Sequence, residues 1–337
     1  MESSVVDKSP ELAASQPALH RRGHGVVRLF THYPTLVLLI LLCVFFSFAT
    51  STFFTSANLT NLVAVQAVTA LVTFAALLPL IVGEFDLSLG YMVGIDTMIG
   101  AYFAGKGWSW IPIVLIMIAA GAVIGLANGL LTVRFKISAF IATLGVGIIL
   151  SGFTSAISNG EVLFNGVPKT IISIGRNNFL GLGISAWLVI VIAIILVYLL
   201  EHTPSGRRLY ATGGSEPVAF LAGVRTGKMK IIAFIGAGVL VAFASIFQLG
   251  QSGSASPSFG PELLLPAYAG AFLSVVSYRP GYFNVPGAII AVLLLAVGFN
   301  GLSLMGVPFW GQPLFNGAVL LLAVLSARAE SRHIKVG

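Results

Sequence analysis

Charged residues are scarce in this sequence. Asp, Glu, Lys and Arg make up 9% of its 337 residues, whereas 57% are hydrophobic. Soluble globular domains usually carry charge on about a quarter of their residues. A water-soluble chain of this length could not keep so much apolar surface away from water. The shortage of charge therefore excludes an ordinary soluble protein and indicates one that is solvated by the lipid bilayer.

Residues that could support catalysis or metal binding are also few. The one cysteine, Cys43, lies in an apolar run and cannot form a disulfide or a cysteine metal site within one chain. The nearest approach to a phosphate-binding loop, residues 100–107, lacks the hydroxyl that would bind magnesium. No nucleophile with a base and no cluster of histidines is visible. The sequence therefore predicts no catalytic residue, no metal site and no cofactor of its own, and any ATP-driven step would need a partner.

Ten apolar segments follow a polar stretch, residues 1–33, that we expect to be a cytoplasmic tail. Most approach the ~20 residues that a helix needs to cross a ~30 Å hydrocarbon core. No small-residue cleavage site follows the first segment, so we expect a retained helix and not a signal peptide. The segments cover residues 34–49, 61–82, 91–104, 110–133, 138–157, 186–200, 230–249, 263–277, 286–304 and 308–326.

The expected fold class is therefore an all-α polytopic membrane protein. About ten transmembrane helices would occupy a permease domain, residues 34–326, and a cytoplasmic tail, residues 327–337, would follow it. With a cytoplasmic N-terminus, the inner side receives fifteen of the eighteen Lys and Arg residues, and the outer side receives Lys106, Lys169 and Arg176. Such a bias is typical of cytoplasmic loops. The basic character therefore reflects topology, with both ends inside the cell, and does not indicate a nucleic-acid partner.

Parts of the two halves of the chain resemble each other. Residues 86–89 recur as residues 262–265, and the Asn-Gly-Leu triplet at 128–130 recurs at 300–302. In the predicted topology the two copies enter the membrane from opposite sides, so that spans two to five match spans seven to ten as an inverted repeat. Inverted repeats with paired short spans are typical of transporters.

Polar side chains within the apolar segments are candidates for a solute pathway. Asp96 lies in the middle of a short span, where a carboxylate is costly unless it faces protein or water. It could line the pathway, or it could bond a neighbouring Ser or Thr or be hydrated near an interface. Amides on or beside the spans could bind a solute or hold helices together. These amides are Gln66, Asn128, Gln248, Asn300, Gln312 and Asn316.

Two further segments have interpretable patterns. Glycine recurs every fourth residue at 121, 125 and 129, which permits close approach of another helix.

In the cytoplasmic segment 203–224, Ser215 can cap a short helix that has Glu216 and Pro217 in its first turn, and Gly223 can end it. Exposed apolar surface on a cytoplasmic face is typical of a partner contact, although this helix could instead lie on lipid.

Four stretches, in this order, resemble the permeases of ribose-, xylose- and galactose-type ABC importers, which are related to branched-chain amino-acid permeases. The stretches are residues 83–90 (GEFDLSLG), 127–130 (ANGL) leading to 140–145 (FIATLG), 206–223, and 284–287 (NVPG). One departure is Glu84, because such permeases commonly carry glycine there. With the polar residues above, the resemblance implies a solute pathway near Gly83, Asp86, Asp96, Asn128, Phe140, Thr143 and Asn300.

The resemblance also implies partners. Two copies of the permease, or this chain and a close homologue, would form a dimer around one pathway. An extracytoplasmic solute-binding protein would deliver the solute, and a cytoplasmic ABC ATPase would hold ATP and magnesium. Residues 206–223 would form the coupling helix that docks in the ATPase. The coupling residues would be Gly206, Arg207, Arg208, Tyr210, Gly213, Gly214, Glu216, Ala219 and Gly223.

Together these features predict a permease subunit in a bacterial inner membrane that moves a monosaccharide or similar polyol inward by alternating access. Two transport alternatives remain open. An ion-coupled secondary transporter or channel would use Asp86, Asp96 and Glu262 as proton or sodium sites. An ABC permease for amino acids would share the architecture. A membrane enzyme is disfavoured, because no reactive constellation is visible.

Overall fold

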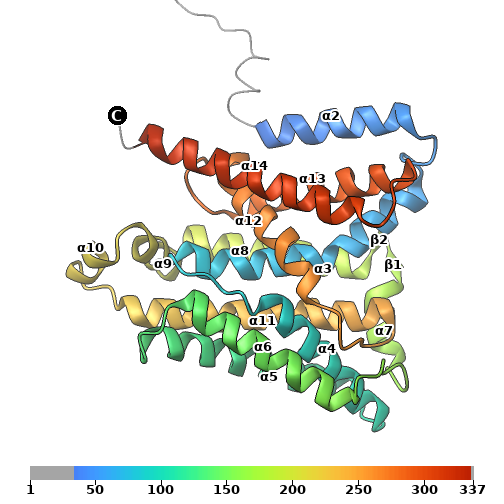
Figure 1. Cartoon of the computed structure of the whole chain (residues 1–337), viewed down its shortest axis with the longest axis horizontal. Coiled ribbons are helices and arrows are strands. Elements are labelled where there is room, and N and C mark those ends of the chain that lie inside the picture. Colours follow the sequence, from blue (N-terminus) through green and yellow to red (C-terminus); the bar gives the residue numbers. More distant parts are fainter. Residues whose placement is uncertain (1–33, 335–337) are drawn as a thin grey trace, which may run out of the picture.

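The structure of the protein, a computed structural model, describes residues 34–334, without the side chains of residues 323 and 326–334 (Figure 1). The predicted N-terminal tail, residues 1–33, lies outside the described residues. Each of the ten predicted apolar segments is helical in the described chain. The helices are α2 (Pro34–Ala49), α3 (Ser56–Ile81), α4 (Leu89–Gly105), α5 (Trp110–Val133), α6 (Ala139–Ser158), α8 (Ile184–Val197), α11 (Thr226–Ser252), α12 (Leu264–Ser277), α13 (Val285–Leu304) and α14 (Gly311–Ile334).

Six helices are long and apolar enough to cross a membrane: α3, α5, α6, α8 with its π-helical extension Tyr198–His202, α11 and α13. Shorter apolar helices are α2, α12 with the turn before it (Pro261–Ser277), and the first part of α14 (Gly311–Leu322). The chain is therefore mostly helical, as expected of a polytopic membrane protein.

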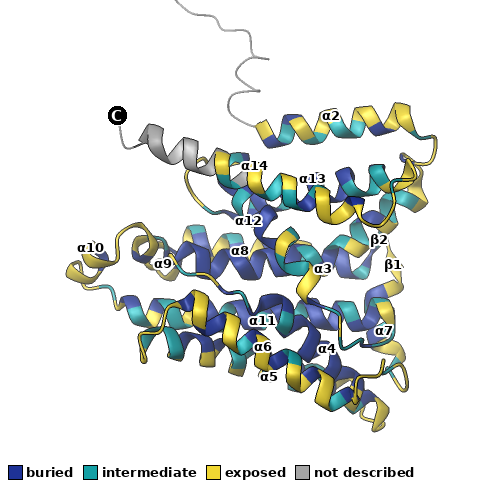
Figure 2. Ribbon diagram, in the orientation of Figure 1, coloured by how far each residue is buried: buried dark blue, intermediate teal, exposed yellow. Residues whose placement is uncertain are grey.

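The core lies around α3 and α11, whereas the outer helices expose apolar side chains. Phe74, Ala75 and Leu77 on α3 are fully buried. Large hydrophobic side chains on α5 and α6, such as Val123 and Ile141, are more than half exposed (Figure 2). Apolar outer faces are what helices need when their solvent is lipid.

Close backbone contact joins α5 to α11. A Cβ atom on Gly121 would overlap the carbonyl oxygen of Gly238, and one on Gly125 would overlap that of Phe234. The prediction from the spacing of glycines 121, 125 and 129 is confirmed, since a larger side chain at either position would push the helices apart.

The two short helices α4 and α12 have equivalent neighbours. Helix α4 packs on α5, α6 and α11, and α12 packs on α13, α14 and α3. Each also contacts the loop that precedes the other. Gly90 and Gly94 of α4 lie against the backbone of residues 259–260, and Tyr268 of α12 bonds Asp86 in the loop before α4.

Short elements lie at the two ends of the helix bundle. One end holds α9 (Pro204–Gly214) and α10 (Glu216–Leu221), and the opposite end holds α7 (Lys169–Arg176) and a hairpin of β1 (Asn178–Phe179) and β2 (Leu182–Gly183) (Figure 1). The helix predicted after Ser215 is confirmed as α10, although the Ser215 side chain makes no capping hydrogen bond. The prediction of one coupling helix over residues 206–223 is wrong, because the segment forms two helices, α9 and α10, that are separated at Ser215.

Candidate functional site

A loop of residues 83–88 joins α3 to α4 and contains two of the predicted pathway residues. Gly83 begins it with φ +83°, a conformation that side chains disfavour. Asp86 is fully buried, and its Oδ1 accepts hydrogen bonds from the Ser88 backbone N–H at 3.0 Å and the Ser88 hydroxyl at 2.5 Å. Asn128 on α5 donates to the Ser88 hydroxyl at 2.8 Å and lies 3.4 Å from both Asp86 oxygens.

Two further helices hold the same loop. The Tyr268 hydroxyl on α12 accepts from the Asp86 N–H at 2.9 Å and donates to the Asp86 carbonyl at 3.0 Å. The Thr143 hydroxyl on α6 accepts from the Leu87 N–H at 2.9 Å. The structure therefore brings Gly83, Asp86, Asn128 and Thr143 together, as residues that fix the loop before α4.

The other predicted pathway residues lie apart from this cluster. Asp96 on α4 is fully buried, and neither carboxyl oxygen has a hydrogen-bond partner among the described residues. The alternative in which a neighbouring Ser or Thr bonds it is therefore wrong, whereas hydration near an interface stays a prediction. Asn300 on α13 exchanges two 3.0 Å hydrogen bonds with Asn58 on α3, so here the amide joins helices. Phe140 is about half exposed on α6.

The predicted coupling residues fall on α9, α10 and the turn after them. Gly206 packs against the carbonyls of Leu199 and Leu200, and Gly213 packs against the end of α3 at Ile81, with no space for a Cβ atom at either glycine. The Tyr210 hydroxyl donates to the Phe283 carbonyl at 2.7 Å. These contacts attach α9 to the bundle.

Helix α10 extends from the bundle and is only partly packed. Ala219 is buried, whereas three apolar side chains, the α10 patch, are exposed: Val218, Phe220 and Leu221. Gly223 follows with φ +82° and turns the chain toward α11. Arg207, Arg208 and Gly214 on α9 are exposed on the same end of the molecule. The structure thus places an apolar patch beside basic side chains.

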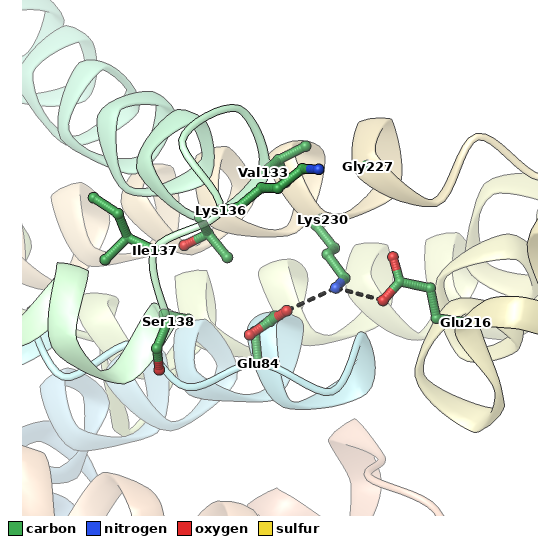
Figure 3. Close-up of a pocket in the computed structure, with 10 residues that line it drawn as sticks. Glu84, Val133, Lys136, Ile137, Ser138, Glu216, Gly227 and Lys230 are labelled. Carbon is green, nitrogen blue, oxygen red and sulfur yellow. Dashed lines mark hydrogen bonds and ion pairs between the residues drawn. The ribbon is translucent and has the colours of Figure 1, made fainter.

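An ion network joins α10 to the 83–88 loop (Figure 3). The Lys230 ammonium on α11 lies 2.8 Å from a Glu84 carboxylate oxygen and 2.7 Å from one of Glu216. The Lys230 hydrogen bond lowers the pKa of Glu216. The network borders a cavity of about 380 Å³ between α5, α6, α10 and α11. Lys230 is therefore the ion-pair partner of Glu84, the residue at a position where the permeases that this sequence resembles commonly carry glycine.

Sequence reasoning missed several residues of these sites. Ser88 lies within a matched stretch, but nothing indicated that its hydroxyl would bind both Asp86 and Asn128. Tyr268 is 182 residues from Asp86 along the chain. Lys230 was counted among the loop charges. In the described part of the chain, no three His, Cys, Asp or Glu side chains gather so that they could hold a metal ion.

Comparisons with known proteins agree with this architecture. The family model described as "Branched-chain amino acid transport system / permease component" matches residues 58–324. The ribose import permease RbsC of Escherichia coli K12 is 31% identical over 86% of this chain and 92% of its own length. RbsC of Bacillus subtilis is 30% identical over 96% and 99%, and the L-arabinose permease AraH of Azospirillum brasilense is 27% identical over 100% and 99%.

No solved structure gives a significant match. The family match covers most of the chain, and it includes the 83–88 loop, α9, α10 and Lys230. It therefore covers both the buried cluster at α4 and the ion network at α10. On these grounds the chain belongs to the family of membrane permease components of ABC transporters that contains the branched-chain amino acid and sugar import permeases.

Proposed function

We propose that this chain is the membrane-spanning permease subunit of an ATP-binding-cassette importer that moves a monosaccharide or similar polyol inward by alternating access. The observation that carries the proposal is that the relatives match over nearly their whole length and are named for sugars: ribose, L-arabinose, galactose and xylose. An amino-acid solute is the second candidate, because the family description names branched-chain amino acids.

The proposed topology has ten crossings with both ends in the cytoplasm. Spans two to five (α3 to α6) would repeat as spans seven to ten (α11 to α14) in the opposite orientation. The equivalent packing of α4 and α12, each against the loop that precedes the other, supports this arrangement. Inverted repeats can exchange conformations, and this exchange converts an outward-open pathway to an inward-open one.

A different partner is proposed to bind at each end of the helix bundle. The α10 patch would dock in a cytoplasmic ATPase, which would hold ATP and magnesium, and Arg207 and Arg208 would flank the contact. An extracytoplasmic solute-binding protein would deliver the solute at the end that holds α7. A second permease copy, or a close homologue, would complete the pathway. Gly83, Asp86, Asp96, Asn128 and Thr143 are proposed to control access to it.

The test is transport by the reconstituted complex. The full chain, its ATPase and its solute-binding protein are placed in proteoliposomes, and uptake of labelled D-ribose, D-xylose, L-arabinose, D-galactose and L-leucine is measured. We expect ATP-dependent uptake of a sugar, and ionophores should not abolish this uptake. Uptake that is driven by an ion gradient without ATP would establish a secondary transporter and refute the proposal. ATP-dependent uptake of L-leucine alone would favour the amino-acid alternative.

A further inference from the structure

A second cavity, of about 280 Å³, lies among α3, the start of α12, α13 and α14. It is separate from the ion network and from the loop that holds Asp86. Most of its wall is apolar, as the composition of these helices requires, but polar groups and one aromatic ring also reach it. The lining residues that matter here are Gln66, Thr69, Glu262, Phe299, Gln312 and Asn316.

The three amides of this cavity lack protein partners. The structure gives no hydrogen bond between the side chains of Gln66, Gln312 or Asn316 and another described residue; Asn316 is buried, Gln66 is half-buried and Gln312 is exposed. Asn58 and Asn300, by contrast, bond each other. Because amides withdrawn from solvent are costly without a partner, the buried Asn316 and the half-buried Gln66 at one cavity indicate that a ligand completes their hydrogen bonds, and the exposed Gln312 lines the same cavity.

The chemistry of the lining favours a neutral polyol. Each amide both donates and accepts, which matches the hydroxyl groups of a sugar, and Phe299 with Leu265 offers apolar surface to C–H groups. Among the described lining residues none is Lys, Arg or His, so nothing would neutralise a carboxylate. Glu262 accepts a hydrogen bond from the Gly260 N–H at 3.1 Å and is the one charged group. An amino-acid solute would leave its carboxylate unpaired here.

The size of the cavity also restricts the ligand. Pockets for drug-sized ligands usually measure roughly 300–1,000 Å³, so 280 Å³ suits one small ring. The lining comes from α3 on one side and from the start of α12 with α14 on the other, which belong to different halves of the proposed repeat. A ligand held between the two halves would be released when they move relative to each other.

We propose that this cavity is a solute-binding site of the pathway, in which Gln66, Gln312 and Asn316 bind the hydroxyl groups of a monosaccharide-sized polyol. The proposal rests on the proposed function and adds to it a site and a solute chemistry. It also adds a reason for the presence of amides on α3 and α14 that helix packing does not supply.

Leucine substitutions test the site in the reconstituted complex. Gln312→Leu and Asn316→Leu should each lower the uptake of the transported sugar about tenfold, which corresponds to 1.4 kcal/mol. Gln248→Leu on α11, an amide outside the cavity, is the matched control and should leave uptake unchanged. All variants should keep the thermal unfolding temperature of the wild type, which separates lost binding from lost folding.

Cysteine labelling gives a second readout that does not depend on turnover. Since Cys43 is the one cysteine of the chain, a Cys43→Ala background permits Asn316→Cys to be labelled with a water-soluble maleimide. The transported sugar at saturating concentration should slow the labelling of Asn316→Cys several-fold, and should not change that of Gln248→Cys. Labelling that the sugar does not slow would count against the site.

The outcomes separate the two proposals. If the wild type shows ATP-dependent sugar uptake but Gln312→Leu and Asn316→Leu stay within twofold of it, the site is refuted and the function stands. If no labelled sugar enters in an ATP-dependent manner, the proposed function is refuted, and the polyol assignment of the cavity with it. Loss of uptake in Gln248→Leu to the same extent would show that any amide in the bundle matters, which also refutes the site.

Discussion

Lys230 should contribute more to stability than a typical surface lysine, because it bridges two carboxylates at the edge of the bundle. The change to study is Lys230→Met, which keeps the length of the apolar stem and removes the charge. The side chains of Lys230, Glu84 and Glu216 are 15%, 19% and 47% exposed. The contact with Glu84 is therefore shielded from water, whereas the contact with Glu216 is not.

The magnitude follows from these exposures. Hydrogen bonds to charged groups contribute about 1.5–3 kcal/mol when partly buried, whereas exposed ion pairs contribute about 0–1 kcal/mol. Lys230→Met also leaves the Glu84 carboxylate without its partner in a largely buried position, which adds to the cost. We expect a loss of about 3 kcal/mol, of which the greater part comes from Glu84.

The assay is thermal unfolding of the purified full chain, combined with hydrogen exchange. A loss of about 3 kcal/mol should lower the Tm by roughly 4 °C, and the amides of α10 should exchange faster. Lys228→Met, an exposed lysine two residues away on the same helix, is the control and should change the Tm by less than about 1 °C. Equal effects of the two variants would refute the reasoning, as would a double variant with Glu84→Gln in which the losses simply add.

Four other predictions address single contacts. Burial, followed by the charge of Glu201, raises the pKa of Tyr210 to about 12, so its neutral hydroxyl donates at physiological pH and Tyr210→Phe should cost about 1 kcal/mol in thermal unfolding. Because the pKa of Glu216 is lowered in the folded chain, its contact with Lys230 stabilises α10 at neutral pH. This stabilisation should be lost as the pH falls below about 4.5 and through the lowered pKa of the folded state, and hydrogen exchange of the α10 amides measured against pH would detect the loss. Asp96→Asn should not lower the Tm, since no hydrogen bond to the carboxylate is lost, and should lower uptake; unchanged uptake would remove Asp96 from the pathway. Gly223→Leu should abolish uptake because its φ is +82°, while solute binding by the external protein, measured by calorimetry, should remain intact.

The sequence predicted the helices of the bundle because the thickness of the lipid hydrocarbon core sets how many apolar residues a membrane-spanning helix needs. A run of about 20 apolar residues has few other stable conformations in lipid, and the predicted limits of α5 agree with the structure residue for residue. The residue pattern alone did not indicate α9 as a separate helix, because three of its residues, Gly206, Gly213 and Gly214, are poor helix formers. Its stability comes from contacts with Leu199, Leu200 and Ile81 that exist only in the folded chain.

The candidate sites were predictable to different degrees. The resemblance placed Asp86, Asn128 and Thr143 near one another, since they belong to matched stretches. The amide cavity could not be predicted, because Gln66 and Gln312 are 246 residues apart (312 minus 66) and nothing in their local sequence distinguishes them from Gln248. Sequence periodicity reports which face of a helix is apolar, but not which faces of distant helices meet.

The ion network and the buried cluster share one loop, and this arrangement limits how α10 can move. Glu84, which binds Lys230, is two residues from Asp86, whose backbone and side chain bond α12 and α5. A displacement of α10 by a docked partner would act first on Glu216 and then on Lys230. Through Lys230 it would act on a loop that cannot shift without breaking hydrogen bonds to three helices, α5, α6 and α12. The effects on stability and on coupling are separable by mutation. Lys230→Met should weaken uptake in the complex by more than its loss of stability explains. Asn58→Ala, which breaks the hydrogen bonds between α3 and α13 but leaves the network intact, should lower stability with uptake preserved. If both variants lose uptake in proportion to stability, the network stabilises the fold without transmitting motion.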